Sequence, residues 1–290
     1  MQKLKVCILG TGNIGTDLLI KTLRSKYIEC TLFAGRNLNS KGMSKALSLG
    51  IQLSDKGIKA IIENPDCCDL VFDATSASSH FEHAPILKKL GKIAIDMTPA
   101  KIGSFSIPSV NIDDSIKHKN LNMITCGGQA SIPMAYAISQ VVNNIKYIEV
   151  VSTISSKSAG PGTRINIDEY IETTQKALAE FSKCENVKTI LNLNPALPSI
   201  DMHTTIYVQT DTPDMEAVKK SVDLMLEKIR EYVPEYDIIV GPEYDNRIIV
   251  LTARVRGMGD YLPKYAGNLD IINCAAIAVA EEFAKNRNKG

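Results

Sequence analysis

The segment Cys126-Gly127-Gly128 combines a nucleophilic side chain with surroundings that suit covalent chemistry. An apolar run predicts a strand that ends just before the cysteine, and a helical pattern follows at 132–143. A thiol at such a junction is exposed and lies near the positive end of a helix, which favours the thiolate. The two glycines leave backbone N–H groups accessible to an oxyanion, whereas a packed core cysteine has no need of them. We therefore predict that Cys126 is a nucleophile.

A glycine-rich segment, Gly10-Thr11-Gly12-Asn13-Ile14-Gly15, directly follows an apolar strand pattern and begins a helical one. In this context Gly10 makes the tight turn, Gly12 removes the Cβ that would block a pyrophosphate, and Gly15 lets helix and strand pack closely. The helix N-terminus then presents N–H groups to phosphate. The strand before the segment and the helix after it favour dinucleotide binding over an ordinary glycine turn.

The residues after the second predicted strand leave the identity of the dinucleotide open. An acidic residue there would bind the ribose 2′-hydroxyl of NAD, but the sequence reads Phe33-Ala-Gly-Arg36-Asn37-Leu-Asn-Ser40-Lys41. Arg36, Ser40 and Lys41 are instead suited to hold a 2′-phosphate. NAD and NADP are therefore both hypotheses for the cofactor.

A cysteine nucleophile in a nicotinamide-binding chain indicates the oxidation of an aldehyde. The thiolate adds to the aldehyde, the thiohemiacetal gives up a hydride, and the resulting thioester passes its acyl group to an acceptor. Water as acceptor would yield an acid, phosphate an acyl phosphate, and coenzyme A (CoA) a thioester. The residues alone leave the acceptor open.

Short β-branched runs alternate with amphipathic segments in the first third of the chain. The predicted strands are 5–9, 30–33, 70–72 and 92–95, with a further strand at 122–125, and the predicted helices are 15–25, 41–49 and 80–90. This rhythm indicates a parallel sheet wound with helices. The fold class is therefore α/β, with a Rossmann-type doubly wound domain.

From Tyr147 onward the pattern changes to longer alternating strands. They are predicted at 147–155, 201–210 and 247–256, with helices near 166–182 and 214–232 between them, which indicates a second, mainly antiparallel α+β domain. A last helix, with Asp270 as its N-cap, returns to the first domain. We predict a dinucleotide-binding domain at 1–125, completed by the helix 266–290, and a catalytic and dimerisation domain at 126–265.

Composition argues against several other classes of function. A net charge of +1 spread over both signs favours neither a nucleic-acid surface nor a membrane surface. No apolar run approaches the roughly 20 residues that a membrane helix needs, and the N-terminal segment does not have the layout of a signal peptide. The seven cysteines are scattered and lack zinc-site spacing, which predicts no metal and a reducing compartment, the cytoplasm. The close pair His80 and His83 is interpreted as surface or capping residues. The small-residue turn Asp73–His80 either lets the backbone approach a cofactor or only caps a helix.

Six segments match one family along nearly the whole chain: Gly10-Thr-Gly-Asn-Ile-Gly-Thr-Asp17, Phe72-Asp-Ala-Thr-Ser76, Asp96-Met-Thr-Pro-Ala100, Thr125-Cys-Gly-Gly-Gln-Ala-Ser-Ile-Pro-Met134, Ile154-Ser-Ser-Lys-Ser-Ala-Gly-Pro-Gly-Thr-Arg164 and Tyr261-Leu-Pro-Lys-Tyr-Ala-Gly-Asn-Leu-Asp270. They closely resemble the acylating acetaldehyde dehydrogenases that partner 4-hydroxy-2-oxovalerate aldolase in the degradation of aromatic compounds. The segments that contain Cys126-Gly-Gly-Gln129 and Ser158-Ala-Gly-Pro-Gly-Thr-Arg164 distinguish this family from aspartate-semialdehyde dehydrogenases of similar fold.

The resemblance implies a homodimeric enzyme that oxidises acetaldehyde, or a short homologue, with NAD as the family's cofactor and CoA as co-substrate. It makes Cys126 the carrier of the acyl thioester, places Thr11 to Ile14 on the cofactor phosphates, and places Asn268 at the nicotinamide end. The segment implied to line the nicotinamide and acyl site comprises Ser158, Ala159, Gly160, Pro161, Gly162, Thr163, Arg164, Ile165 and Asn166. Lys157 or Arg164 could meet phosphate there, or the segment could be only a mobile connector.

The chain departs from the family at two places. An Arg-Asp pair thought to place an acid near the thiol reads His203-Thr204 here, so His203, Asp201 or no side chain at all assists the cysteine. The chain between Tyr236 and Arg247 is also shorter than in the family. Two alternatives therefore stay open: a semialdehyde dehydrogenase with phosphate or water as acceptor, and a nicotinamide-binding regulatory protein without catalysis.

Overall fold

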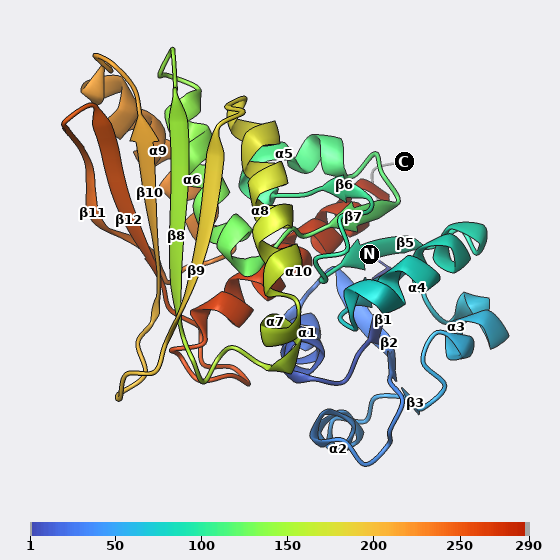
Figure 1. Cartoon of the computed structure of the whole chain (residues 1–290). Coiled ribbons are helices and arrows are strands. Elements are labelled where there is room, and N and C mark those ends of the chain that lie inside the picture. Colours follow the sequence, from blue (N-terminus) through green and yellow to red (C-terminus); the bar gives the residue numbers. More distant parts are fainter. Residues whose placement is uncertain (1, 288–290) are drawn as a thin grey trace. The chain divides into compact units, whose positions relative to one another are not determined.

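The computed structural model describes residues 2–287, apart from the side chains of Pro161 and Gly162 (Figure 1). The chain forms two compact units. Unit 1 contains Met1–Met123, Asp260–Leu262 and Asn273–Gly290, and unit 2 contains Ile124–Gly259 and Pro263–Ile272. Each unit is built on one sheet, and the predicted α/β class with a second α+β domain is confirmed.

Unit 1 has a seven-stranded sheet in the order β3-β2-β1-β4-β5-β7-β6, and every pairing in it is parallel. Because the chain moves outward in opposite directions from β1 and β4, the carboxyl ends of these two strands form a switch point, where ligands bind in such sheets. The strands are β1 Leu4–Leu9, β2 Ile28–Ala34, β3 Leu53–Ser54, β4 Leu70–Asp73, β5 Ile93–Asp96, β6 Ser104–Phe105 and β7 Asn120–Asn122. The helices are α1 Asn13–Arg24, α2 Lys41–Ser48, α3 Lys59–Glu63, the 3-10 turn Pro65–Cys67, α4 Ala77–Lys89 and α5 Pro108–Ser115.

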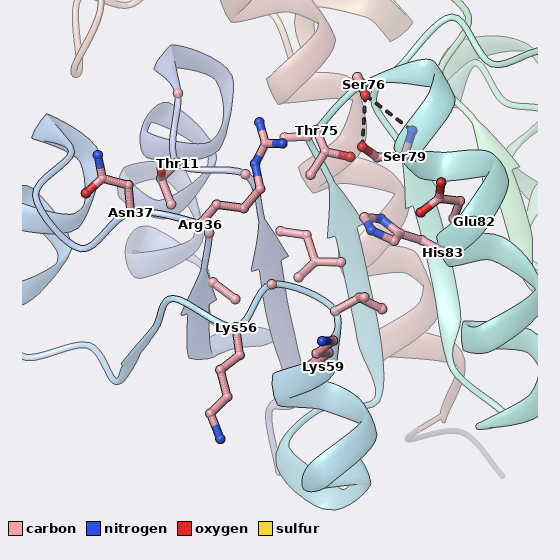
Figure 2. Close-up of a pocket in the computed structure, with 18 residues that line it drawn as sticks. Thr11, Arg36, Asn37, Lys56, Lys59, Thr75, Ser76, Ser79, Glu82 and His83 are labelled. Carbon is pink, nitrogen blue, oxygen red and sulfur yellow. Dashed lines mark hydrogen bonds between the residues drawn. The ribbon is translucent and has the colours of Figure 1, made fainter.

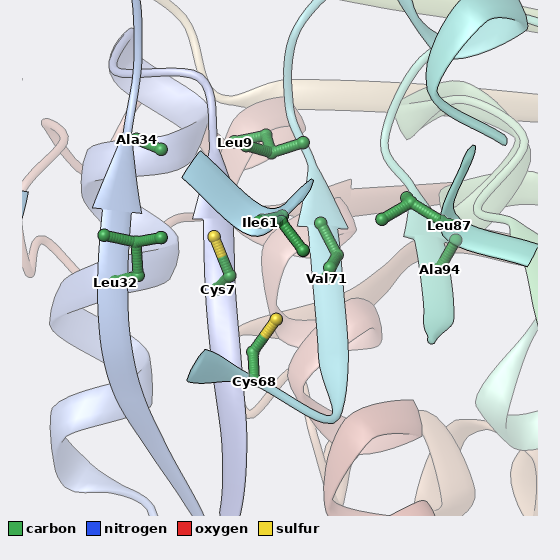
Figure 3. Close-up of a cluster of buried hydrophobic side chains, with 9 residues drawn as sticks. All are labelled: Cys7, Leu9, Leu32, Ala34, Ile61, Cys68, Val71, Leu87 and Ala94. Atoms are coloured by element: carbon green, nitrogen blue, oxygen red, sulfur yellow. The ribbon is translucent and has the colours of Figure 1, made fainter. Parts of the chain in front are cut away.

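A cluster of buried side chains covers one face of this sheet (Figure 3). Cys7 and Leu9 of β1 lie in it, while Val6 and Ile8, which point to the other face, are equally buried. A strand buried on both faces reads as a continuous apolar run, which is why the sequence pattern there shows no alternation. Cys68 also belongs to the cluster, so its role is packing.

The first histidine of the pair in α4, His80, lies in the interior, so its interpretation as a surface or capping residue was wrong. His80 is fully buried, and its Nδ1 lies 2.9 Å from Asp73 Oδ2 while its Nε2 lies 3.6 Å from Asp96 Oδ2. His83 Nδ1 lies 2.8 Å from the same Asp73 oxygen. The histidines hold the pKa of Asp73 well below its usual range, whereas burial raises the pKa of Asp96 to about 7. His80 therefore links the ends of β4 and β5.

Replacing His80 with alanine should destabilise unit 1, because the Asp73 carboxylate loses the fully buried one of its two histidine partners and keeps its desolvation cost. We expect His80→Ala to lower the free energy of unfolding by about 3 kcal/mol in denaturant titrations. His83→Ala is the matched control, because His83 bonds to the same carboxylate from a partly exposed position. Equal losses from the two variants would contradict a special role for the buried histidine.

Unit 2 has a five-stranded sheet in the order β11-β12-β10-β8-β9, antiparallel except for the parallel pair β8 and β9. Helices α6, α8 and α9 cover one face of it (Figure 1). The strands are β8 Tyr147–Ser155, β9 Val187–Asn194, β10 Met202–Gln209, β11 Tyr236–Asp245 and β12 Ile248–Val255. The helices are α6 Cys126–Ser139, α7 Pro161–Ile165, α8 Ile167–Ser182, α9 Met215–Arg230 and the first residues of α10 Gly267–Arg287.

Several element boundaries differ from the sequence predictions. Strands β9 and β11 were not predicted, because β9 has no regular alternation of buried residues and the pairing of β11 is interrupted by register shifts. Helix α10 begins at Gly267, so Asp270 lies in its first turn and does not cap it. A Cβ at Gly267 would lie 2.1 Å from the Val255 carbonyl oxygen, so only glycine permits this start. No described helix, α10 included, combines the length and apolar character needed to cross a lipid bilayer.

Candidate active site

The turn between β1 and α1 brings backbone segments into contact in unit 1. Gly10 has a φ of 104°, and a Cβ there would lie 2.3 Å from the carbonyl oxygen of Ala74, which follows β4. A Cβ at Gly15 would lie 1.9 Å from the Gly10 carbonyl oxygen. By contrast, a Cβ at Gly12 would meet nothing within 4 Å. Gly10 and Gly15 are thus required by packing, while the space above Gly12 is open.

The N-terminus of α1 is suited to an anion. Gly12 is its N-cap, no side chain caps the helix, and its first turn holds no acidic residue. The first N–H groups of a helix have no partner within the helix, and its dipole attracts negative charge. The predicted phosphate-binding residues Thr11, Asn13 and Ile14 therefore lie at a terminus that fits a dinucleotide phosphate.

A pocket of about 600 Å³ opens beside this turn (Figure 2). Arg36, which follows β2, lies on one side of the pocket, and His83 of α4 lies on the other (Figure 2). Its lining includes Gly10, Thr11, Gly12, Asn37, Lys56, Lys59, Thr75, Ser76 and Ser79. The turn after β4 thus lines the pocket, and it also caps α4, because Ser76 Oγ accepts a hydrogen bond from the Ser79 N–H at 3.2 Å.

Two basic side chains that line the pocket were not predicted from the sequence, and two residues that were predicted lie outside its lining. Lys56 and Lys59 follow β3, a strand of two residues that has no sequence signal of its own. Ser40 instead caps α2 by accepting a hydrogen bond from the Met43 N–H at 3.2 Å. Lys41 is the first residue of that helix. Arg36 is therefore the one residue of the suggested 2′-phosphate set that lines the pocket.

In unit 2, Cys126 is the first residue of α6, whereas the sequence predicted that this helix begins at 132. Thr125 is the N-cap, and its Oγ1 accepts a hydrogen bond from the Gly128 N–H at 2.9 Å. The helix was predicted to begin near 132 because two glycines weaken a helix. The packing of α6 against α8 and α9 overrides this preference, and a Cβ at Gly128 would lie 2.7 Å from Ile124 Cγ2.

The Cys126 thiol is half-buried and has a neutral partner. Its sulfur lies 3.8 Å from the hydroxyl oxygen of Tyr170, and the N–H groups of Cys126 and Gly127 favour its ionised form. Burial nevertheless raises the pKa of the thiol to about 11. The backbone N–H groups act in the expected direction, but the thiol is less exposed than the sequence suggested, and its desolvation outweighs them.

The two side chains suggested as bases lie apart from this thiol. Thr204 of β10 is buried, and its Oγ1 lies 2.9 Å from Ser152 Oγ, which faces Gly127. Because neighbouring residues of a strand point to opposite faces, His203 points away from the face that α6 covers. Asp201 pairs with Arg256 at 3.1 Å. The structure thus brings neither His203 nor Asp201 together with Cys126.

The remaining predicted residues also belong to unit 2. The Arg164 guanidinium donates to the carbonyl oxygens of Ser156 and Ala159 at 3.0 and 3.1 Å, so it holds its own segment in shape. The residues 158–166 comprise a short loop, α7 and the N-cap Asn166 of α8, with the side chains of Pro161 and Gly162 outside the described part. Asn268 is 1% exposed, and neither side-chain polar atom has a hydrogen-bond partner among the described residues. An amide ligand such as a nicotinamide carboxamide would fit that need.

Two solved structures of another protein share this architecture. Aspartate semialdehyde dehydrogenase II from Vibrio cholerae has a similar structure: its complex with ASA aligns with a TM-score of 0.68 at 13% identity, covering 99% of each chain. A second structure of that protein aligns with a TM-score of 0.66 at 14% identity, covering 98% of this chain and 99% of that one. At such identities the likeness shows the two-domain dehydrogenase fold alone.

Sequence comparison identifies the family. Residues 126–263 match the family model described as prokaryotic acetaldehyde dehydrogenase, dimerisation. The acetaldehyde dehydrogenase of Pectobacterium atrosepticum is 55% identical, covering 99% of this chain and 97% of that protein, and that of Spirochaeta aurantia is 56% identical, covering 98% and 96%. The one from Burkholderia thailandensis is 49% identical, covering 96% and 94%.

The chain belongs to the acetaldehyde dehydrogenase family. It is therefore an aldehyde-acting oxidoreductase that uses a nicotinamide cofactor, and the alternative of a non-catalytic regulatory protein is set aside.

The two glycines of the α1 turn give a matched pair of variants. Gly12→Ala should fold normally but weaken nicotinamide dinucleotide binding by about tenfold, since its methyl group enters open space at the phosphate-binding terminus. Gly15→Ala should lower the free energy of unfolding by about 3 kcal/mol, because its Cβ meets backbone. Calorimetric titration and thermal unfolding measure the two effects. Wild-type affinity in a folded Gly12→Ala protein would contradict the placement of the phosphates.

Proposed function

We propose that this chain is a CoA-acylating aldehyde dehydrogenase that oxidises acetaldehyde or a short-chain homologue. The observation that carries the proposal is the position of the Cys126 sulfur at the first turn of α6, beside the N–H groups of Cys126 and Gly127. These groups suit an anion that forms next to the sulfur. The names of relatives that are 49–56% identical support acetaldehyde as the substrate.

In the proposed reaction, Cys126 forms a covalent intermediate with the aldehyde. The Cys126 sulfur attacks the aldehyde carbon, and the thiol proton ends on the carbonyl oxygen, which gives a thiohemiacetal. Loss of a hydride from carbon and of a proton from the hydroxyl leaves an acyl thioester on Cys126. The nicotinamide ring, when bound, supplies the acceptor for that hydride. The CoA thiol then attacks the thioester, and the acyl group leaves on CoA while Cys126 regains its proton.

We propose cofactor-binding residues in each of the two units. Residues Gly10 to Gly15 bind its phosphates at the N-terminus of α1. Asn268 binds the nicotinamide carboxamide, which would satisfy its buried amide, and the segment 158–166 lines the nicotinamide and acyl site. NAD is the cofactor that the family resemblance favours, while the basic pocket around Arg36 supports NADP.

The choice between NAD and NADP depends on Arg36. If the Arg36 guanidinium binds a 2′-phosphate, Arg36→Ala should weaken NADP binding by about tenfold and leave NAD binding unchanged. Lys45→Ala is the control, since Lys45 is an exposed cation of α2 outside the pocket lining. Affinities measured side by side decide the point, and an unaltered preference in Arg36→Ala would rule out this role.

The acceptor is tested by supplying aldehyde and nicotinamide cofactor with CoA, with phosphate or with neither. We expect sustained formation of reduced cofactor, together with thioester absorbance, only when CoA is present. A Cys126→Ser variant should show no turnover with any acceptor, because it lacks the thiol. Turnover that requires phosphate would instead support the semialdehyde dehydrogenase alternative.

We further propose a homodimer that forms through the uncovered face of the unit 2 sheet. In the described residues no helix of unit 2 covers the face opposite α6, and its side chains, among them Val151, Tyr207 and Val250, are half-buried. A second copy of the chain would cover this face, in keeping with the dimerisation model that matches residues 126–263.

The cellular setting is proposed from the cysteines and the family resemblance. All seven cysteines carry free thiols, which suits a reducing compartment, the cytoplasm. A 4-hydroxy-2-oxovalerate aldolase, acting in the breakdown of aromatic compounds, is the partner that the resemblance suggests as the source of the aldehyde.

A further inference from the structure

Tyr170 reaches into the first turn of α6 and takes the place of a side chain. A Cβ on Gly127 would lie 2.0 Å from the Tyr170 hydroxyl oxygen and 3.0 Å from Ser152 Oγ. Alanine at position 127 would therefore expel the phenol. The glycine next to the cysteine is thus explained by the tyrosine, and not only by the need for accessible N–H groups.

The position of the phenol is fixed by contacts between α8 and α6. Tyr170 and Thr174 are four residues apart on α8 and therefore share one face of the helix. Thr174 Oγ1 donates to the Tyr170 carbonyl oxygen at 2.7 Å and also lies 2.7 Å from Oγ1 of Thr125, the N-cap of α6. Tyr170 itself is only 6% exposed. The hydroxyl therefore stays beside the sulfur without help from solvent.

The groups that hydrogen-bond to the sulfur are neutral. They are the Tyr170 hydroxyl and the N–H groups of Cys126 and Gly127, and the nearby Ser152 and Thr204 side chains are hydroxyls that pair with each other. In the thiol form, the Cys126 S–H donates to the phenol oxygen across 3.8 Å. When the sulfur is ionised, the phenol O–H can donate in the reverse direction. Burial holds the pKa of Tyr170 well above its usual value, so the phenol keeps its proton while it does so.

We propose that Tyr170 is a catalytic residue whose hydroxyl donates a hydrogen bond to the ionised sulfur of Cys126 and so supports the attacking thiolate. This role rests on the proposed function, in which Cys126 is the nucleophile. Tyr170 acts as a donor only, and the thiol proton leaves to the aldehyde oxygen or to solvent. Sequence patterns give no sign of this role, because the tyrosine lies 44 positions from the cysteine in an ordinary amphipathic helix.

The test is the rate at which iodoacetamide alkylates Cys126, followed by mass spectrometry of the peptide that contains it. This reaction needs no aldehyde, cofactor or CoA, so its outcome is independent of whether the acyl acceptor has been identified correctly. Below the pKa of the thiol, the rate follows the fraction of thiolate. Loss of a hydrogen bond to a charged group should reduce that fraction about tenfold or more. Since a more basic sulfur is also more nucleophilic, the expected rate loss in Tyr170→Phe is about three- to tenfold.

Tyr236→Phe is the matched control. The Tyr236 hydroxyl is also buried against α6, but it donates to the Ala130 carbonyl oxygen at 2.6 Å and not to the sulfur. We expect its alkylation rate to equal that of the wild type. Equal rates in Tyr170→Phe and the wild type, or equal losses in both variants, would overturn the proposal.

A second substitution keeps the test decisive if Tyr170→Phe folds poorly. Incorporation of 3-fluorotyrosine at position 170 retains the ring and its hydroxyl and makes the phenol a stronger donor. Alkylation of Cys126 should then become faster than in the wild type at the same pH, and its pH profile should move to lower pH. An unchanged or slower rate in the folded, fluorinated protein would contradict the donor role.

Discussion

The close approach of Tyr170 to the first turn of α6 is the constraint on which the thiol site depends. The phenol lies where a Cβ of residue 127 would stand, so a side chain at position 127 would displace the Tyr170 hydroxyl from the sulfur. Glycine weakens a helix, and here Thr125 caps the helix while packing around Gly128 holds its first turn. The result is a sulfur at a helix N-terminus with a neutral donor beside it. Desolvation raises the pKa of the thiol, and each hydrogen bond to the ionised sulfur lowers it.

Close contacts that only a residue without a Cβ permits also shape the turn between β1 and α1 in unit 1. Gly10 and Gly15 are required because backbone meets backbone, between the turn and Ala74 in one case and within the turn in the other. Gly12 has no such contact, and its lack of a side chain instead leaves the N-terminus of α1 open. The glycines of one motif therefore have different roles: Gly10 and Gly15 are required by backbone packing, and Gly12 keeps the proposed phosphate-binding site open.

The features that the sequence could predict are those encoded locally. Strand and helix rhythm gave the α/β class, and the glycine segment and Cys126 stand at the ends of elements where ligands and nucleophiles are found. Features that depend on distant segments were missed. Lys56 and Lys59 join the pocket after a strand of two residues, and Tyr170 meets Cys126 only through the packing of α8 on α6. His203 was suggested as a base because it occupies part of the family's Arg-Asp position, and a strand pattern does not reveal which of its two faces meets the helix.

The central claim is that Cys126 carries the acyl group. Its most direct test is mass spectrometry of the protein after incubation with acetaldehyde and nicotinamide cofactor in the absence of CoA. We predict an acyl adduct on the peptide that contains Cys126, and its loss when CoA is added. An adduct on another cysteine, or none while reduced cofactor forms, would contradict the claim.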